Sequence, residues 1–158
     1  MKASWRTGVS FGLTSAVITT LGLMVGLHSG THSKIIVLSG IFTIAIADAF
    51  SDALGIHISK EFENAHTVKE IWGATLSTFL AKFLFAMTFV VPVFFLSLSL
   101  AIIASVVWGF LILTCLSYLM AKANAEPAWK IIGEHVLIAG VVVVITHWVG
   151  DWLGTMAQ

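Results

Sequence analysis

Long apolar runs separated by short polar breaks make up most of the chain. The stretch from 72 to 120 is too long for one membrane crossing, which takes about 20 helical residues, so we divide it after Pro92. Backbone polar groups inside lipid must be paired within the segment itself, which favours helices. The pattern predicts an all-α integral membrane protein, a five-transmembrane-helix bundle in which residues 1–158 form a single transmembrane domain. The predicted spans are residues 9–27, 35–58, 72–96, 100–120 and 131–153.

The composition agrees with a membrane protein, since 58% of the residues are hydrophobic and 10% are charged. Soluble domains carry about 45–50% apolar and about 25% charged residues, so this chain cannot build a water-soluble surface. The formal net charge is zero, which excludes a basic nucleic-acid-binding surface. Cys115 is the one cysteine, so no disulfide forms within the chain. The sequence has no Gly-rich phosphate loop and no Cys/His spacing typical of zinc, and we predict neither an enzyme nor a bound cofactor.

The basic residues predict which side of the membrane each connection faces, because cytosolic connections are enriched in Lys and Arg. With a cytosolic N-terminus, Lys34 lies outside and Lys82 lies within the membrane. All other basic residues then lie on the cytosolic side: Lys2, Arg6, Lys60, Lys69, Lys122 and Lys130. We therefore predict a cytosolic N-terminus in the cell membrane, and five spans place the C-terminus outside.

Small residues recur along three of the predicted helices at intervals of three, four or seven. In lipid, this spacing lets helix backbones approach closely, so we interpret these faces as packing seams. The seam of the first helix consists of Gly8, Gly12, Ser15, Thr19, Gly22 and Gly26. The same spacing in the second helix selects Ile41, Ala45, Asp48, Asp52, Gly55 and Ser59. In the last helix, heptad spacing selects Gly133, Gly140, His147 and Gly154.

Asp48 and Asp52 are the strongest candidates for a functional site. They lie one turn apart on the same face of a predicted membrane helix. A carboxylate at the bilayer centre costs about 2.5–3.5 kcal/mol on insertion scales, so such residues usually pair or bind a ligand. Two carboxylates at this spacing can coordinate a divalent cation or load and release protons, with Ser51 or Ser59 as weak helpers.

Lys82 offers a structural alternative to that function. Counted from the inner boundary, Lys82 lies at nearly the same depth as Asp48 and can neutralise its carboxylate. A buried ion pair of this kind can do no more than fix the register of the helices. The same ammonium can also act as a tethered cation that competes with a substrate. The sequence leaves these interpretations open.

Two further groups of polar residues are candidate metal ligands. His147 and Asp151 lie four residues apart near the outer end of the last helix, where they can share a metal or relay protons. An interfacial hydrogen bond is the alternative for this pair. Glu61 and Glu63 lie in the inner segment 59–71, whose oxygen ligands suit hard cations. A solvated loop that partly extends the second helix is the alternative there.

Four short segments of the first two helices resemble a known family. They are GVSFGLT at 8–14, TTLGLMVG at 19–26, IVLSG at 36–40 and AFSDALG at 49–55. These segments are similar to the opening helices of the vacuolar iron transporter family. The resemblance is best over residues 6–63, and five spans with an inner connection after the second helix also match the family.

The resemblance implies a homodimer that removes Fe²⁺, and often Mn²⁺, from the cytosol in exchange for protons. It also implies that the first two helices of each copy line the metal path, with the small-residue seams at the two-fold axis. The chain departs from the family pattern in three places. Phe11 stands where the first helix of the family is acidic, Asp52 replaces a methionine and Asp48 a small residue, and the glutamate-rich domain after the second helix is missing. Exchange of a thioether for a carboxylate favours harder cations such as Mn²⁺, Mg²⁺ or Ca²⁺.

We therefore predict a transporter of divalent cations, with the metal ion as substrate and the lipid bilayer and a second copy of the chain as partners. Its predicted metal ligands are Asp48, Asp52, Ser51, His147, Asp151, Glu61 and Glu63, with Lys82 as a candidate charge partner. Two alternatives belong to other classes. A membrane assembly subunit uses the buried charges only for packing, and an intramembrane aspartyl hydrolase pairs Asp48 or Asp52 with Asp151.

Overall fold

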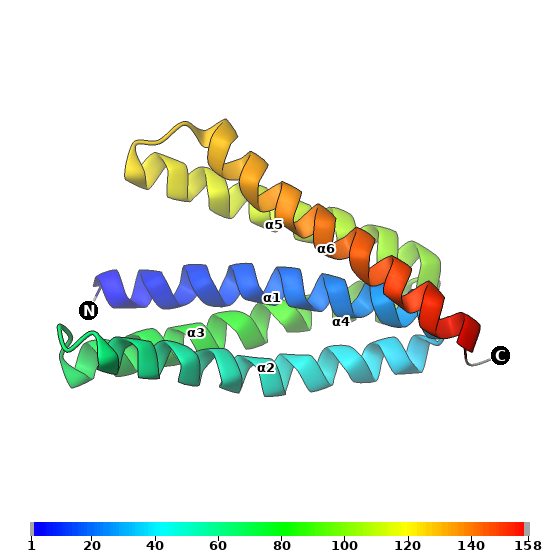
Figure 1. Ribbon diagram of the computed structural model, residues 1–158, viewed down its shortest axis with the longest axis horizontal. Helices are drawn as coiled ribbons and strands as arrows, with labels where there is room; N and C mark the ends of the chain where they lie inside the picture. Colours follow the sequence, from blue (N-terminus) through cyan, green and yellow to red (C-terminus); the bar gives the residue numbers. More distant parts are fainter. Residues whose placement is uncertain (1, 157–158) are drawn as a thin grey trace.

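The computed structural model describes the chain from residue 2 to residue 156, with side chains from residue 3 onward (Figure 1). The helices are α1 (Lys2–Thr31), α2 (Lys34–Phe62), α3 (Val68–Thr88), α4 (Val90–Phe95), α5 (Leu98–Asn124) and α6 (Ala128–Met156). No strand occurs between residues 2 and 156. Five helical segments are long and apolar enough to span a membrane: Ala3–Thr31, Lys34–Phe62, Val68–Phe95, Leu98–Asn124 and Ala128–Met156. The predicted all-α, five-span architecture is confirmed over this range, and residues 1 and 157–158 lie outside it.

The third span consists of α3 and α4 with a break between them. Phe89 separates the two helices, and its amide donates to the carbonyl of Ala86 at 3.1 Å. Pro92 has no amide hydrogen, so the carbonyl of Thr88 cannot be bonded in the α-helical pattern. α4 ends at Phe95, and α5 begins two residues after Leu96. The division of the long apolar stretch after Pro92 is therefore confirmed.

The connections on either side of α2 are shorter than the sequence pattern indicates. α1 continues to Thr31, whose hydroxyl donates to the carbonyl of Leu27 at 2.6 Å. At the other end, α2 continues to Phe62, and α3 begins directly after Thr67, which forms a capping box with Glu70. The capping box satisfies free amides of α3, so the helix starts early. The predicted inner segment 59–71 is therefore mostly helical, and only 63–67 connects the two helices.

The two ends of the bundle carry different connections (Figure 1). The N-terminus, the α2–α3 connection and the α5–α6 connection lie at one end, which we call the N-terminal end. The α1–α2 connection and the last turns of α6 lie at the opposite, C-terminal end. There the ammonium of Lys34 donates to the carbonyls of Phe94 and Leu96 at 3.2 and 2.9 Å, near the C-terminus of α4. A cation at this position is favourable, because the last carbonyls of a helix carry a partial negative charge.

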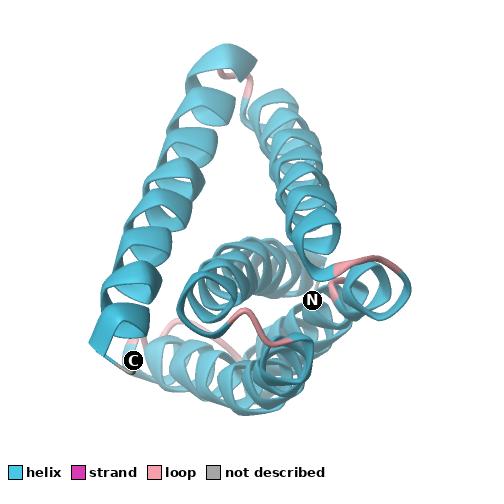
Figure 2. Cartoon of the chain, turned by 90° about the vertical axis from the view of Figure 1, so that its right-hand side faces the viewer, coloured by secondary structure: helices cyan, strands magenta, loops and turns pink. Residues whose placement is uncertain are grey.

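α1 lies at the centre of the bundle. It contacts α2, α3, α5 and α6, and half of its membrane-spanning stretch is buried, against 6% for α6. α2 and α3 pack beside α1, whereas α5 and α6 form a hairpin whose tip leans away from the other helices (Figures 1 and 2). The core between the helices is aliphatic and aromatic, and includes Val17, Leu21, Met24, Ile41, Phe89 and Leu113.

Glycines of α1 allow this close packing. At Gly8 and Gly12 the backbone of α1 lies against α3, and at Gly26 it lies against α6 beside Gly150. The interpretation of this seam as a helix-packing face is therefore confirmed. These glycines face helices of their own chain, and their implied location at a two-fold axis stays a prediction. The predicted seam of the last helix contacts other helices over only part of its length. At Gly133, nothing lies within 4 Å of an added Cβ.

Gly12→Ala tests the packing of α1 on α3. A Cβ at Gly12 would lie 2.5 Å from the carbonyl oxygen of Thr78, so the two helices would have to separate. Overpacking costs about 1–3 kcal/mol, and we expect the free energy of unfolding in detergent to fall by about that amount. Circular dichroism along a denaturant titration measures it.

Gly73→Ala is the matched control, because nothing lies within 4 Å of a Cβ added at this α3 position. Alanine is favoured over glycine in a helix by about 1 kcal/mol, so this variant should be at least as stable as the parent protein. Equal stability of the Gly12 and Gly73 variants would contradict the close approach of α1 and α3.

Candidate cation site

Lys82 of α3 joins the two aspartates of α2 in one charged cluster. Its ammonium lies 2.5 Å from a carboxylate oxygen of Asp48 and 2.5 Å from one of Asp52. It donates hydrogen bonds to Asp52 and, at 2.6 Å, to the hydroxyl of Ser15 on α1. The contact with Asp48 is an ion pair without the alignment of a hydrogen bond, because Oδ2 of Asp48 has no hydrogen-bond partner. We call Ser15, Asp48, Asp52 and Lys82 the Lys82 cluster.

Helical spacing and small neighbouring residues bring this cluster together. Asp48 and Asp52 lie one turn apart on α2, so a single ammonium can reach both carboxylates. α2 also buries Ala45, Ala49 and Ala53, and such small side chains let neighbouring helices come close. α1, α2 and α3 all contact one another around the cluster. Lys82 therefore links three helices through polar contacts.

The cluster is open on one side only. The side chain of Lys82 is 1% exposed, whereas those of Asp48 and Asp52 are 26% and 18% exposed. The ammonium thus lies behind the carboxylates as seen from the surface. Loss of one partner from a buried ion pair typically costs about 3–5 kcal/mol, because it leaves an uncompensated charge. Lys82 and the two aspartates consequently depend on each other.

Asp48 lines an open groove between α1 and α2, with a volume of about 720 Å³. Much of the lining is apolar, and the polar side chains in it are Thr19, Ser39, Thr43, Asp48 and Ser51. A second groove, of about 630 Å³, follows α1 to α6 and shares four lining residues with the first, Thr19, Leu23, Leu27 and Ile44. We call the two together the α1 groove. It places one carboxylate and several hydroxyls on an open surface inside the membrane-spanning part of the chain.

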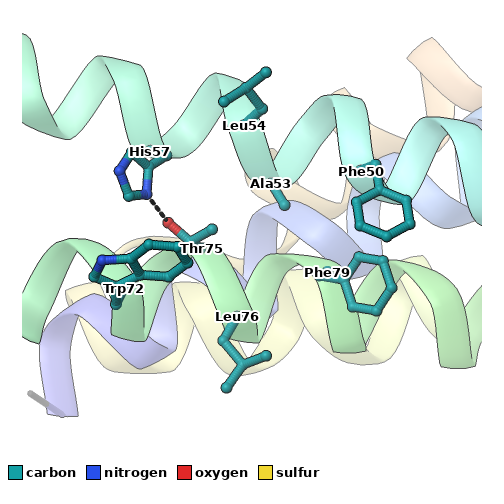
Figure 3. A pocket seen from close by; sticks show the side chains of 8 residues that line it. All are labelled: Phe50, Ala53, Leu54, His57, Trp72, Thr75, Leu76 and Phe79. Carbon is teal, nitrogen blue, oxygen red and sulfur yellow. Dashed lines mark hydrogen bonds between the residues drawn. The ribbon is translucent and has the colours of Figure 1, made fainter.

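A separate cavity of about 530 Å³ lies between α2 and α3 (Figure 3). Its walls are aromatic, with Phe50 against Phe79 at a ring-centroid distance of 4.7 Å. Its main polar group is His57, which shares a hydrogen bond of 2.9 Å with the hydroxyl of Thr75 and meets the ring of Trp72 edge-on (Figure 3). Sequence reasoning missed His57. The sequence held one indication of its role: His57 lies four residues before Glu61, a spacing at which two side chains of a helix can pair.

Glu61 and Glu63 have histidine partners at the N-terminal end. Glu61 lies 3.4 Å from His57, and Glu63 lies 2.7 Å from His66. Both carboxylates are more than half exposed, at 59% and 52%. Neither residue lines the α1 groove. The structure therefore does not bring these predicted ligands together with Asp48 and Asp52.

His147 and Asp151 lie near the C-terminal end of α6, where it packs on α1. Nε2 of His147 lies 3.5 Å from the Asp151 carboxylate, and its Nδ1 forms a hydrogen bond with the hydroxyl of Ser29 on α1. Next to Ser29, His28 contacts His32 at a ring-centroid distance of 5.4 Å. Asp151 thus pairs with His147, while Asp48 and Asp52 pair with Lys82. The aspartates that an intramembrane hydrolase would need side by side belong to two different groups.

The Lys82 cluster by itself is a sparse set of metal ligands. Between residues 2 and 156, no group of three His, Cys, Asp or Glu side chains could hold a metal ion. Hard divalent cations take six or more oxygen ligands, and the cluster supplies two carboxylates and one hydroxyl. Water, hydroxyls of the α1 groove or a second copy of the chain would have to supply the remaining ligands.

Comparison with protein-family models and with curated protein sequences finds no match for the chain. The resemblance to the vacuolar iron transporter family accordingly depends on the segments 8–14, 19–26, 36–40 and 49–55 alone. The Lys82 cluster and the α1 groove are the structural features that bear on its function.

Ser51→Cys tests whether water enters the α1 groove. In a Cys115→Ser background, a charged thiol reagent should label a cysteine at Ser51, because this side chain is exposed in the groove. Ser77→Cys is the matched control, since Ser77 is fully buried where α3 meets Gly8. We expect labelling at position 51 to be at least about tenfold faster, because the reactive thiolate requires a polar environment. Slow labelling at both positions would contradict a water-filled groove.

Proposed function

We propose that this chain is a membrane transporter that moves divalent cations of the Fe²⁺ or Mn²⁺ kind out of the cytosol in exchange for protons, and that it works as a homodimer. The observation that carries the proposal is the Asp48 carboxylate in an open, partly polar groove within a membrane span. The resemblance of the first two helices to the vacuolar iron transporter family supports the same class of substrate.

The few polar atoms of the mostly apolar α1 groove are unfavourable next to lipid tails. Thr43, Asp48 and Ser51 present oxygen atoms there, and hydrocarbon offers them no hydrogen bonds. A second copy that packs its own groove against this one would remove these oxygens from lipid and enclose a polar path. Closed two-fold symmetry brings the same surface of both copies together, as such a path requires.

The charge of the Lys82 cluster suits a cation. Two carboxylates and one ammonium leave a net charge of −1. Two grooves facing one path would offer two Asp48 carboxylates, each with Asp52 one turn away on α2. Hydroxyls and water would complete a coordination shell of oxygen ligands, which suits Mn²⁺, Mg²⁺ or Ca²⁺ better than softer metals.

The basic residues support a cytosolic location of the N-terminal end. Arg6, Lys60 and Lys122 belong to the N-terminal end, whereas Lys34 belongs to the C-terminal end. By the positive-inside rule, the N-terminal end would face the cytosol, and we propose that the membrane is the cell membrane. His147 and Asp151 then lie near the outer face, where they would relay protons or receive the departing ion.

One observation favours a second candidate, an assembly subunit without transport activity. Lys82 contacts both aspartates, and such a network can hold α1, α2 and α3 in register without binding any ion. The two candidates differ in what replacement of the aspartates does. A transporter loses flux while its fold is kept, whereas an assembly subunit has no flux to lose.

Uptake into proteoliposomes that contain only this protein tests the proposal. We expect saturable uptake of Mn²⁺ or Fe²⁺ that depends on an imposed pH gradient. The double variant Asp48→Asn/Asp52→Asn should reduce this uptake at least about a hundredfold, because the ion loses its charged ligands. Parallel measurements with Co²⁺, Mg²⁺ and Ca²⁺ rank the substrates.

Glu126→Gln is the matched control, because it also removes a carboxylate but lies in the exposed α5–α6 connection. Its uptake should equal that of the unmodified protein. Unchanged uptake in the double aspartate variant would refute the site. No uptake of any ion by folded, inserted protein would refute the transport function and favour the assembly subunit.

A further inference from the structure

We propose that Lys82 sets the affinity of the α1 groove for its cation, as a fixed counter-charge that keeps the bound ion weakly held and able to leave. This inference rests on the proposed transport function. In this proposal Lys82 tunes the affinity for the cation, in addition to forming ion pairs that hold the helices together.

The position of Lys82 separates its charge from the path of the ion. Its side chain is 1% exposed and does not line the groove, whereas Asp48 does line it. The ammonium acts on the carboxylates from behind, through contacts of 2.5 Å with Asp48 and Asp52. It therefore lowers the negative charge that an ion meets without blocking its way.

The contacts of Lys82 hold its charge in place. The hydroxyl of Ser15 accepts a hydrogen bond from the ammonium at 2.6 Å, on the side of α1. Asp48 and Asp52 are the charged groups that face it from α2, and α1 contributes the uncharged Ser15. A lysine anchored in this way cannot swing into the groove without leaving a buried charge unpaired.

The charges indicate why a transporter would need this lysine. With Lys82, each chain carries a net charge of −1 in the cluster, and two chains together match one divalent cation. Without it, the Asp48 carboxylates that two chains bring to their grooves, and the Asp52 carboxylate beside each, would have no compensating charge. Passage through a membrane requires a site attractive enough to admit an ion and weak enough to release it. Lys82 would make the site weak enough to release the ion.

A series of variants that differ in cluster charge tests this role. Lys82→Gln changes the charge per chain from −1 to −2, and Asp52→Asn changes it to zero. The double variant Lys82→Gln/Asp52→Asn restores −1 with side chains of similar size. Lys122→Gln is the control for loss of a lysine, because Lys122 is exposed near the end of α5.

Two quantities are measured for each purified variant. The first is the affinity for Mn²⁺ alone in detergent, from the loss of the spin-resonance signal of free Mn²⁺. The second is the maximal rate of Mn²⁺ uptake into proteoliposomes. We expect Lys82→Gln to bind Mn²⁺ about tenfold or more tightly and to transport it about tenfold more slowly, since changing a residue that contacts metal ligands typically shifts affinity by about 10–100-fold. Asp52→Asn should bind more weakly than the unmodified protein.

The double variant separates charge from packing. If Lys82 acts through its charge, the double variant recovers an affinity within about threefold of the unmodified protein, a small change on the scale of 10–100-fold for lost metal contacts. If Lys82 only holds helices together, its replacement weakens Mn²⁺ binding, and removal of Asp52 does not restore it. The double variant leaves only Asp48 without a counter-charge, whereas Lys82→Gln leaves both aspartates without one, so the double variant keeps the test decisive should Lys82→Gln fold poorly.

Different measurements decide the role of Lys82 and the proposed transport function. Uptake by the unmodified protein decides whether the chain is a transporter. Unchanged or weaker Mn²⁺ binding by Lys82→Gln, in a protein that does transport, would overturn the role of Lys82 alone. Absence of Mn²⁺ binding and uptake in every variant would overturn both proposals.

Discussion

A lysine ammonium inside a membrane protein needs anionic partners, and this need organises the centre of the molecule. Lys82 is almost fully buried and reaches Asp48 and Asp52 on α2 and Ser15 on α1. These contacts connect the three helices on one side of the bundle. The carboxylates are in turn tolerable at membrane depth because the ammonium offsets part of their charge. The packing of the helices and the chemistry of the site therefore depend on the same ion pairs.

The open side of the cluster distinguishes it from an ordinary structural ion pair. Asp48 remains 26% exposed and lines the α1 groove, so the cluster reaches an open surface as well as the interior of the bundle. Thr19 and Ser51 add hydroxyls along the same groove. Such a surface is unfavourable in lipid unless water, an ion or a second copy of the chain covers it. A cation path would account for this exposed carboxylate, and a structural role would account for its contact with Lys82.

Much of the fold follows from the sequence because lipid permits few solutions. Helices are the form that satisfies the backbone, so the lengths of the apolar runs define five spans, and Pro92 marks the break after the third. The residues of the candidate site could also be predicted from the sequence. Asp48 and Asp52 share a face by helical spacing, and a count of residues from the membrane boundary places Lys82 at a similar depth.

The parts that the sequence did not predict depend on how the helices pack. The glycine seam of α1 looks like one surface, but Gly12 faces α3 and Gly26 faces α6. No spacing rule says which helix meets which part of a seam. Ser15 as a partner of Lys82, and Thr75 as a partner of His57, likewise require the register between neighbouring helices. The extension of α2 into the inner segment was among the alternatives, but the early start of α3 was missed because Thr67 and Glu70 cap a helix there instead of forming a loop.

The most direct test of a cation path at Asp48 is the anomalous scattering of Mn²⁺ in crystals of the protein grown with lipid. We expect a manganese peak within coordination distance of Asp48 in the α1 groove, between two copies related by two-fold symmetry, with Lys82 still in contact with Asp52. A groove filled by lipid tails, with manganese bound only at exposed carboxylates such as Glu61 and Glu63, would contradict it.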